Sequence, residues 1–158
     1  MDGQVVIISA PSGSGKSMWL AELITKELMR GQCVHVCSAA KTYETFLSYI
    51  KEHYNSDGSC FSSPLSLSAL FGSADIFALE DVDIFLSGRE NTQNTFAQII
   101  VEAAHEGKKI YLTGIELQAR AHHFIETVKR YCPNLKIHTS VKRQYERITN
   151  TAVGGPCT

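Results

Sequence analysis

Residues 10–17, with the sequence Ala-Pro-Ser-Gly-Ser-Gly-Lys-Ser, combine the groups that bind phosphate in proteins. Glycines allow successive backbone N–H groups to turn inward around phosphate oxygens. Lys16 would add a positive charge near the β- and γ-phosphates of a nucleotide, and the Ser17 hydroxyl would bind Mg²⁺. The pattern predicts a phosphate-binding loop, whose expected contacts with the nucleotide come from Ser12, Gly13, Ser14, Gly15, Lys16 and Ser17.

Two elements must hold this loop in place. Residues 5–8 are apolar without interruption, which is typical of a buried strand, and residues 18–30 repeat apolar side chains at helical spacing. A helix that begins at the loop directs the positive end of its dipole toward the phosphates. Ala10 stands where the usual pattern has glycine, and its small side chain keeps the turn open. The inward face of the predicted helix carries Leu20, Leu23, Ile24 and Leu28.

Two acidic residues end a second apolar segment. Residues 75–79 predict a strand, and Glu80 and Asp81 follow it directly. Beside a phosphate loop, Glu80 would hold Mg²⁺ through water, and Asp81 would polarise an attacking water. Asp is more common than Glu at the metal position, and Mg²⁺ requires nearly ideal octahedral geometry, so we expect weakened or shifted metal binding. Two alternatives stay open: a shifted register that makes Asp81 the metal residue, or two acids that end a strand in solvent.

Strands and helices alternate along the chain. The predicted strands cover residues 5–9, 33–37, 75–79, 110–113 and 135–138. The predicted helices cover residues 18–30, 42–54, 91–105 and 119–131, with one short helix around residues 65–71. This alternation predicts an α/β fold, a three-layer P-loop NTPase core with a five-stranded parallel sheet and helices on both faces. We expect one nucleotide-binding domain over residues 1–148 and a disordered tail over residues 149–158.

Composition and charge limit the partners and the cellular location that we expect for this chain. The 158 residues carry a formal net charge of −1, so no global basic field indicates nucleic-acid binding. No apolar run approaches the ~20 residues that span a bilayer, and the N-terminus shows no secretory signal. Cys33 and Cys37 would lie ~13 Å apart on a strand, too far to share a metal by themselves. We therefore expect a cytoplasmic protein with core or half-buried thiols and no membrane partner.

The segment of residues 78–93 resembles a known family. Its sequence, Ala-Leu-Glu-Asp-Val-Asp-Ile-Phe-Leu-Ser-Gly-Arg-Glu-Asn-Thr-Gln, is similar to that of the bacterial replication initiator DnaA and its regulatory relative Hda. In that family a strand ending in two acids precedes Gly-(Arg/Lys)-Glu-x-Thr-Gln. The resemblance covers roughly residues 4–148. It implies an AAA+ ATPase core that binds ATP or ADP with Mg²⁺ and acts by nucleotide-dependent self-association or protein partner binding, with weak or no hydrolysis.

The resemblance also implies roles for two further residues. Lys129-Arg130-Tyr131 is similar to the Ser-Arg-Phe box of the family, so Arg130 would be an arginine finger for the γ-phosphate held by a neighbouring subunit. A solvated cation at a helix end is the equal alternative. Thr113 would sense the γ-phosphate, although Gly114 and Ile115 stand where the family has Ser and an acid. We expect no helical lid domain and no DNA-binding helix–turn–helix.

Other functions and partners stay open. The phosphate loop also resembles that of guanylate kinase, but residues 41–73 contain no Arg for the acceptor site that a nucleoside monophosphate kinase needs. A non-hydrolysing interaction or adaptor module with the same fold is the main alternative. Lys and Arg residues in the last third could contact nucleic acid, although a solvated face is the simpler interpretation. Trp19 is expected to be a partly buried core aromatic, with an interface anchor as the alternative.

Overall fold

The structure is a computed structural model that describes residues 3–53, 66–87 and 90–139. The predicted tail over residues 149–158 lies outside them. The strands are β1 (Gln4–Ser9), β2 (Val34–Ser38), β3 (Ile76–Glu80), β4 (Lys109–Gly114) and β5 (Lys136–His138). The helices are α1 (Lys16–Met29), α2 (Ala39–His53), α3 (Leu67–Phe71), α4 (Asp83–Leu86), α5 (Glu90–His105), α6 (Leu117–Arg120) and α7 (His122–Tyr131).

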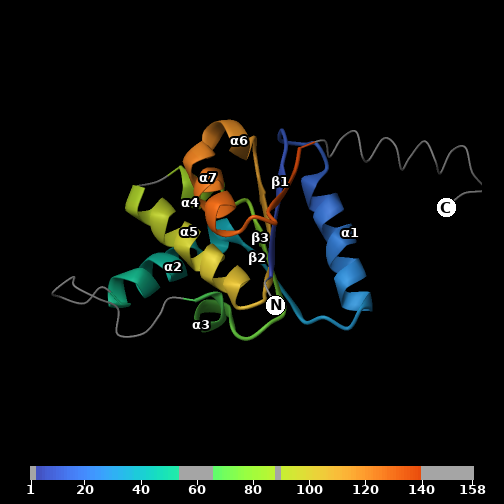
Figure 1. Ribbon diagram of the computed structural model, residues 1–158, viewed down its shortest axis with the longest axis horizontal. Helices are drawn as coiled ribbons and strands as arrows, with labels where there is room; N and C mark the ends of the chain where they lie inside the picture. The colour runs from blue at the N-terminus through green and yellow to red at the C-terminus, as the bar shows by residue number, and fades with distance from the viewer. Residues whose placement is uncertain (1–2, 54–65, 88–89, 140–158) are drawn as a thin grey trace, which may run out of the picture.

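The five strands form one parallel sheet in the order β2-β3-β4-β1-β5. Helix α1 covers one face, whereas α2, α5 and α7 lie on the other (Figure 1). Because successive side chains of a strand point to opposite faces, β1 contributes to both cores. Val5 and Ile7 pack in the larger core, while Val6 and Ile8 pack beneath α1. The predicted α/β architecture, with a five-stranded parallel sheet and helices on both faces, is confirmed.

Aromatic rings fill the larger core. Phe96 of α5 is 1% exposed and stacks on Phe85 at 4.5 Å between ring centroids and on Phe124 at 5.6 Å. Phe46 of α2 meets Phe85 edge to face at 4.7 Å. These contacts join α2, α4, α5 and α7 into one layer. The layer carries the elements that follow β3 and β4, and so it fixes how those two strands end.

Helix α1 departs from its predicted inward face at its last turn. Leu28 is 54% exposed, and Glu27 is buried in its place at 5% exposed. With a turn every 3.6 residues, Glu27 lies about 20° from Leu20 around the helix, whereas Leu28 lies about 80° away. The apolar spacing favoured Leu28 because a charged residue is rarely buried unless it is paired. The prediction for Leu28 was therefore wrong.

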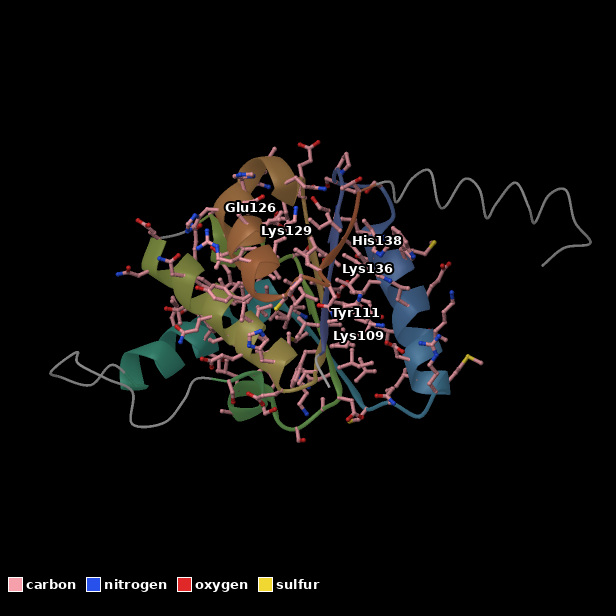
Figure 2. The ribbon with its side chains drawn as sticks, in the orientation of Figure 1. Lys109, Tyr111, Glu126, Lys129, Lys136 and His138 are labelled. Atoms are coloured by element: carbon pink, nitrogen blue, oxygen red, sulfur yellow. The ribbon has the colours of Figure 1, made fainter. Side chains whose placement is uncertain are left out.

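Glu27 is buried because β4 supplies its partners. Lys109 Nζ lies 2.9 Å from the Glu27 carboxylate, and the Tyr111 hydroxyl donates a hydrogen bond to it at 3.2 Å. Arg30 adds an ion pair at 3.0 Å. Lys109 and Tyr111 lie on the side of the sheet that α1 covers (Figure 2). Burial alone would raise the pKa of Glu27, but hydrogen bonding and attraction from Lys109, with help from Tyr111 and Arg30, hold it below its usual value.

The predicted helix over residues 119–131 is two helices. Ala121 separates α6 from α7 with φ −131° and ψ 43°, although alanine has a high helix propensity. Tertiary contacts therefore override local preference. Leu117 N–H donates a hydrogen bond to Ser9 Oγ at 2.6 Å, and Arg120 pairs with Asp83 at 3.2 Å, so α6 is anchored to other elements at both ends.

The described thiols differ in exposure. Cys132 is buried and Cys37 half-buried, whereas Cys33 is exposed, which corrects the expectation of core or half-buried thiols at that position. Cys33 begins no strand, because β2 starts one residue later. Among the described residues, no cluster of three or more ligating side chains could hold a metal ion. None of the helices in this part of the chain is long and apolar enough to cross a bilayer.

Candidate functional site

The carboxyl ends of β1, β3 and β4 lie at one edge of the sheet, and the predicted phosphate loop follows β1 there. Gly13 and Gly15 have φ of 76° and 93°, in the left-handed region that favours glycine. Gly15 precedes the first residue of α1, and its carbonyl accepts a hydrogen bond from Trp19 N–H at 3.0 Å. The two glycines thus allow the chain to turn sharply from a buried strand into a helix.

The side chain of Lys16 lies within this loop. Lys16 is 8% exposed, and its Nζ donates a hydrogen bond to the Pro11 carbonyl at 2.9 Å. The Ser14 hydroxyl donates to the same carbonyl at 2.6 Å. The loop is therefore closed by its own residues around a positive charge. The other predicted contacts lie around this charge: Ser12, Gly13 and Ser17 are exposed, and Gly15 is half-buried.

The two acids after β3 occupy different environments. Glu80 is the last residue of the strand and is half-buried. Strand alternation places it on the same face as Ile76 and Ala78, which pack in the core beneath α1. Asp81 leaves the strand with φ 58° and is exposed. Glu80 thus faces the side of the sheet on which Lys16 and Ser17 begin α1, whereas Asp81 turns out of the strand.

Thr113 connects β4 to this turn. Its hydroxyl accepts a hydrogen bond from Asp81 N–H at 3.0 Å, and its carbonyl accepts one from Val82 N–H at 2.9 Å. Thr113 is 2% exposed and pairs with Ile8, two residues before Ala10, across β4 and β1. The structure therefore brings the predicted Thr113 and Asp81 together at one edge.

Asp83 extends this connection, and the sequence analysis did not identify it. Asp83 Oδ2 accepts hydrogen bonds from Ile115 N–H at 2.9 Å and from Arg120 at 3.2 Å. Arg120 also donates to the Ile115 carbonyl at 3.3 Å. Ile115 stands where the resembling family has an acid, and here a carboxylate from the neighbouring strand end binds its backbone instead. The third acid in Glu-Asp-Val-Asp was the available signal.

Ser9 and Gly114 end β1 and β4 at the same edge of the sheet, and the sequence analysis assigned neither of them a role. The Ser9 hydroxyl donates a hydrogen bond to Gln118 Oε1 at 2.6 Å and accepts one from Leu117 N–H at 2.6 Å. A Cβ atom at Gly114 would lie 2.7 Å from the side chain of Leu117, which is 1% exposed. Close packing of Leu117 therefore accounts for glycine at a position where the family has Ser. Only the tertiary fold reveals the partners of Ser9, because Leu117 and Gln118 lie more than a hundred residues further along the chain.

The negative charge of Glu80 helps to raise the pKa of the Cys37 thiol on β2. Burial raises the pKa of Cys37 to about 11, with a further increase from the Glu80 carboxylate and a partly opposing hydrogen bond from Thr42. Cys37 and Leu79 are register partners in the parallel pair of β2 and β3. The carboxylate of Glu80 therefore lies within electrostatic range of β2.

Arg130 is not brought together with the other predicted site residues. It is exposed in the last turn of α7, a helix that leaves the edge after β4 and leads back toward the start of β5. Ten residues of helix span about 15 Å, so Arg130 lies toward the opposite edge of the sheet from Lys16. Arg130 is therefore too far from the Lys16 loop of its own chain to contact a phosphate there, and it could contact only a phosphate bound by another chain.

No family model matches the chain, and no curated protein matches it. Solved structures do match. AMPPCP-bound DnaA from Aquifex aeolicus superposes with a TM-score of 0.61 at 20% identity, over 100% of this chain and 47% of that one. Domain III of the Thermotoga maritima replication initiation protein DnaA gives a TM-score of 0.62 at 14% identity, over 94% and 63% of the two chains.

The chain has the fold of a DnaA-like AAA+ core. A further match, the replication initiator DnaA bound to AMPPCP and single-stranded DNA, has a TM-score of 0.62 at 20% identity. The chain spans 46–47% of the length of the initiator structures first matched. Gly88 and Arg89, part of the segment that carried the resemblance, lie outside the described residues. The match in fold over the whole sheet supports the resemblance independently of that segment.

Proposed function

We propose that this chain binds ATP or ADP through residues 12–17 and that nucleotide binding drives self-association or binding of a protein partner, with weak or no hydrolysis. The observation that carries the proposal is the position of the Lys16 loop, at the same sheet edge as Glu80, Asp81 and Thr113. The fold adds support, since two of the similar DnaA structures have AMPPCP bound.

The residues at the edge fit Mg²⁺ held jointly with a nucleotide. Mg²⁺ prefers oxygen ligands and is commonly bound by one or two carboxylates together with substrate phosphates, with several waters retained. Ser17 and Glu80 supply a hydroxyl and a carboxylate of this kind. When bound, the metal would neutralise charge on the β- and γ-phosphates. The absence of a larger ligand cluster among the described residues agrees with a metal that arrives with the nucleotide.

The positions of the charged groups support the proposal of weak hydrolysis. Asp81 is exposed, and only its backbone is held by Thr113, so its carboxylate is poorly fixed for orienting a water. Arg120 is the arginine nearest in sequence to the end of β4, and it is already paired with Asp83. Arg130 lies toward the opposite edge. A cation supplied by a neighbouring subunit would stabilise the transition state and link hydrolysis to assembly.

A nucleotide titration with and without Mg²⁺, followed by calorimetry and by sedimentation, tests the proposal. We expect ATP to bind to the wild type, Lys16→Ala to abolish binding, and ATP to increase the sedimentation coefficient of the wild type alone or with its partner. Lys26→Ala, which removes an exposed charge from the last turn of the same helix, is the matched control and should bind ATP normally. No binding of ATP or ADP at high micromolar protein would disprove the proposal.

The same measurements separate the alternatives. Binding without turnover, unaffected by Asp81→Asn, would favour the non-hydrolysing adaptor module. Stimulation of ADP production by a nucleoside monophosphate would favour the kinase instead. Turnover that Asp81→Asn abolishes would favour the ATPase and assign Asp81 its predicted role.

A further inference from the structure

The first two turns of α1 carry an aromatic contact that the phosphate loop does not explain. The ring of Trp19 lies 4.7 Å from that of His138 on β5, measured between centroids, with 55° between the ring planes. Both residues are half-buried, and Trp19 packs at the margin of the core beneath α1. The pair is therefore fixed by the fold on one side and open to solvent on the other.

The sheet order determines on which side of the loop a nucleoside would lie. β1 stands between β4 and β5, and the acids and Thr113 belong to strands on the β4 side. Glu80 would hold Mg²⁺ together with the terminal phosphates of a bound nucleotide, which would place these phosphates on the side of Glu80. The α-phosphate and the nucleoside must then leave the loop on the β5 side.

On the β5 side the structure presents His138 and Trp19. His138 is the register partner of Ile8, two residues before the loop starts at Ala10, so it lies just below the loop. Trp19 is two residues beyond Ser17 and is tied to Gly15 through its N–H. His138 and Lys136 lie on the side of the sheet that α1 covers (Figure 2). We propose that Trp19 and His138 form the stacking platform for the base of the bound nucleotide.

The chemistry of the pair fits a nucleobase. Every base presents a π-face, and aromatic side chains stack on it with little sequence preference. Burial, with a contribution from Lys136, lowers the pKa of His138 below its usual value, so the imidazole is neutral near pH 7 and adds no charge against a neutral base. The platform therefore contributes affinity for a nucleoside, and it discriminates a nucleotide from an inorganic phosphate chain.

This inference rests on the nucleotide binding proposed above, and its test separates the two. Trp19 is the single tryptophan of the chain and reports on its own environment by fluorescence. ATP and ribose 5′-triphosphate, which lacks only the base, are titrated into the wild type with Mg²⁺ and followed by calorimetry and fluorescence. We expect both ligands to bind, ATP more tightly, and only ATP to change the fluorescence of Trp19.

Variants provide the second measurement. Trp19→Leu should weaken ATP binding by about tenfold or more, the loss expected for one stacked base, and leave ribose 5′-triphosphate binding unchanged. Trp19→Phe keeps an aromatic face and should lose less, and His138→Ala should weaken ATP selectively as well. Met29→Ala, on the same helix and 82% exposed, is the control and should bind both ligands normally.

The outcomes are distinguishable. Binding of ATP that neither changes Trp19 fluorescence nor depends on Trp19 would overturn the platform and leave the proposed function intact. An equal loss for both ligands in Trp19→Leu would also overturn it, because the residue would then act through the loop. A wild type that binds neither ligand would overturn both proposals.

Discussion

The hydroxyl of Thr113 accepts a hydrogen bond from the backbone N–H of Asp81 at 3.0 Å, which joins the ends of β4 and β3. The carbonyl of the same residue accepts from Val82 N–H at 2.9 Å. A single residue thus holds the left-handed turn that directs Asp81 away from the strand. The turn is local in sequence, but its geometry depends on a side chain more than thirty residues further along the chain.

Replacing Thr113 by valine should release this turn. Valine keeps the shape of threonine but cannot accept the hydrogen bond, which leaves Asp81 N–H without its partner, at a cost of about 1 kcal/mol. We expect the Asp81 amide to exchange with solvent roughly fivefold faster or more in Thr113→Val, as measured by NMR hydrogen exchange. Thr113→Ser keeps the hydroxyl and should keep the protection. Equal exchange in the wild type and the valine variant would contradict the assignment.

Adding a methyl group at Gly114 should disturb the edge by packing alone. The new Cβ would lie 2.7 Å from the Leu117 side chain, which is buried and cannot move freely. We expect Gly114→Ala to lower the free energy of unfolding by about 1–3 kcal/mol, measured by urea denaturation. In a Leu117→Ala background the same substitution should cost less, since the clash is gone. Additive losses in the double variant would rule out this contact as the cause.

The burial of Glu27 predicts a pH-dependent term in stability. The pKa of Glu27 lies below its usual 4.5 in the folded chain. A lowered pKa means that the folded state favours the carboxylate, so this stabilisation is full above the unfolded-state pKa and is lost as pH falls through the folded-state pKa. We expect the advantage of the wild type over Glu27→Gln, measured by urea denaturation, to hold at pH 7 and shrink below about pH 4.5.

Glu22 provides the matched control for this measurement. It is an exposed glutamate on the same helix, and Glu22→Gln should change stability little at any pH. Lys109→Met should move the acid transition of the protein to higher pH, because without the lysine only Tyr111 and Arg30 oppose the effect of burial, and the pKa of Glu27 rises. An unchanged acid transition in Lys109→Met would show that the ion pair does not determine the titration.

The thiol of Cys37 should report the charge at Glu80. With a pKa of about 11, roughly one Cys37 thiol in a thousand is ionised at pH 8, so alkylation should be slow. Glu80→Gln removes the negative charge that helps to raise this pKa and should accelerate labelling by iodoacetamide, mapped by mass spectrometry. Cys33, which is exposed, serves as the internal reference and should be labelled equally in both proteins. Identical Cys37 rates would show that Glu80 does not act on this thiol.

Local patterns were sufficient to predict the strands and the glycine-containing loop between β1 and α1. The uninterrupted apolar run before the loop and the glycines within it depend only on neighbouring residues, and β1, the loop and α1 appear where these patterns predict. The same holds for Glu80 at the end of β3. Such features follow from hydrophobic periodicity and from the steric freedom of glycine, which a chain expresses before any long-range contact forms.

Long-range contacts decided the features that local patterns did not predict. Glu27 is buried only because Lys109 and Tyr111 lie opposite it, and the helix after β4 breaks at Ala121 because its first turn is tied to Ser9. The sequence by itself predicted a phosphate-binding loop between β1 and α1, and it determined the alternation of strands and helices. The tertiary structure decided that Thr113 holds the Asp81 turn and that Arg130 lies toward the opposite edge of the sheet from Lys16, because the order of strands in a sheet depends on contacts between segments distant along the chain.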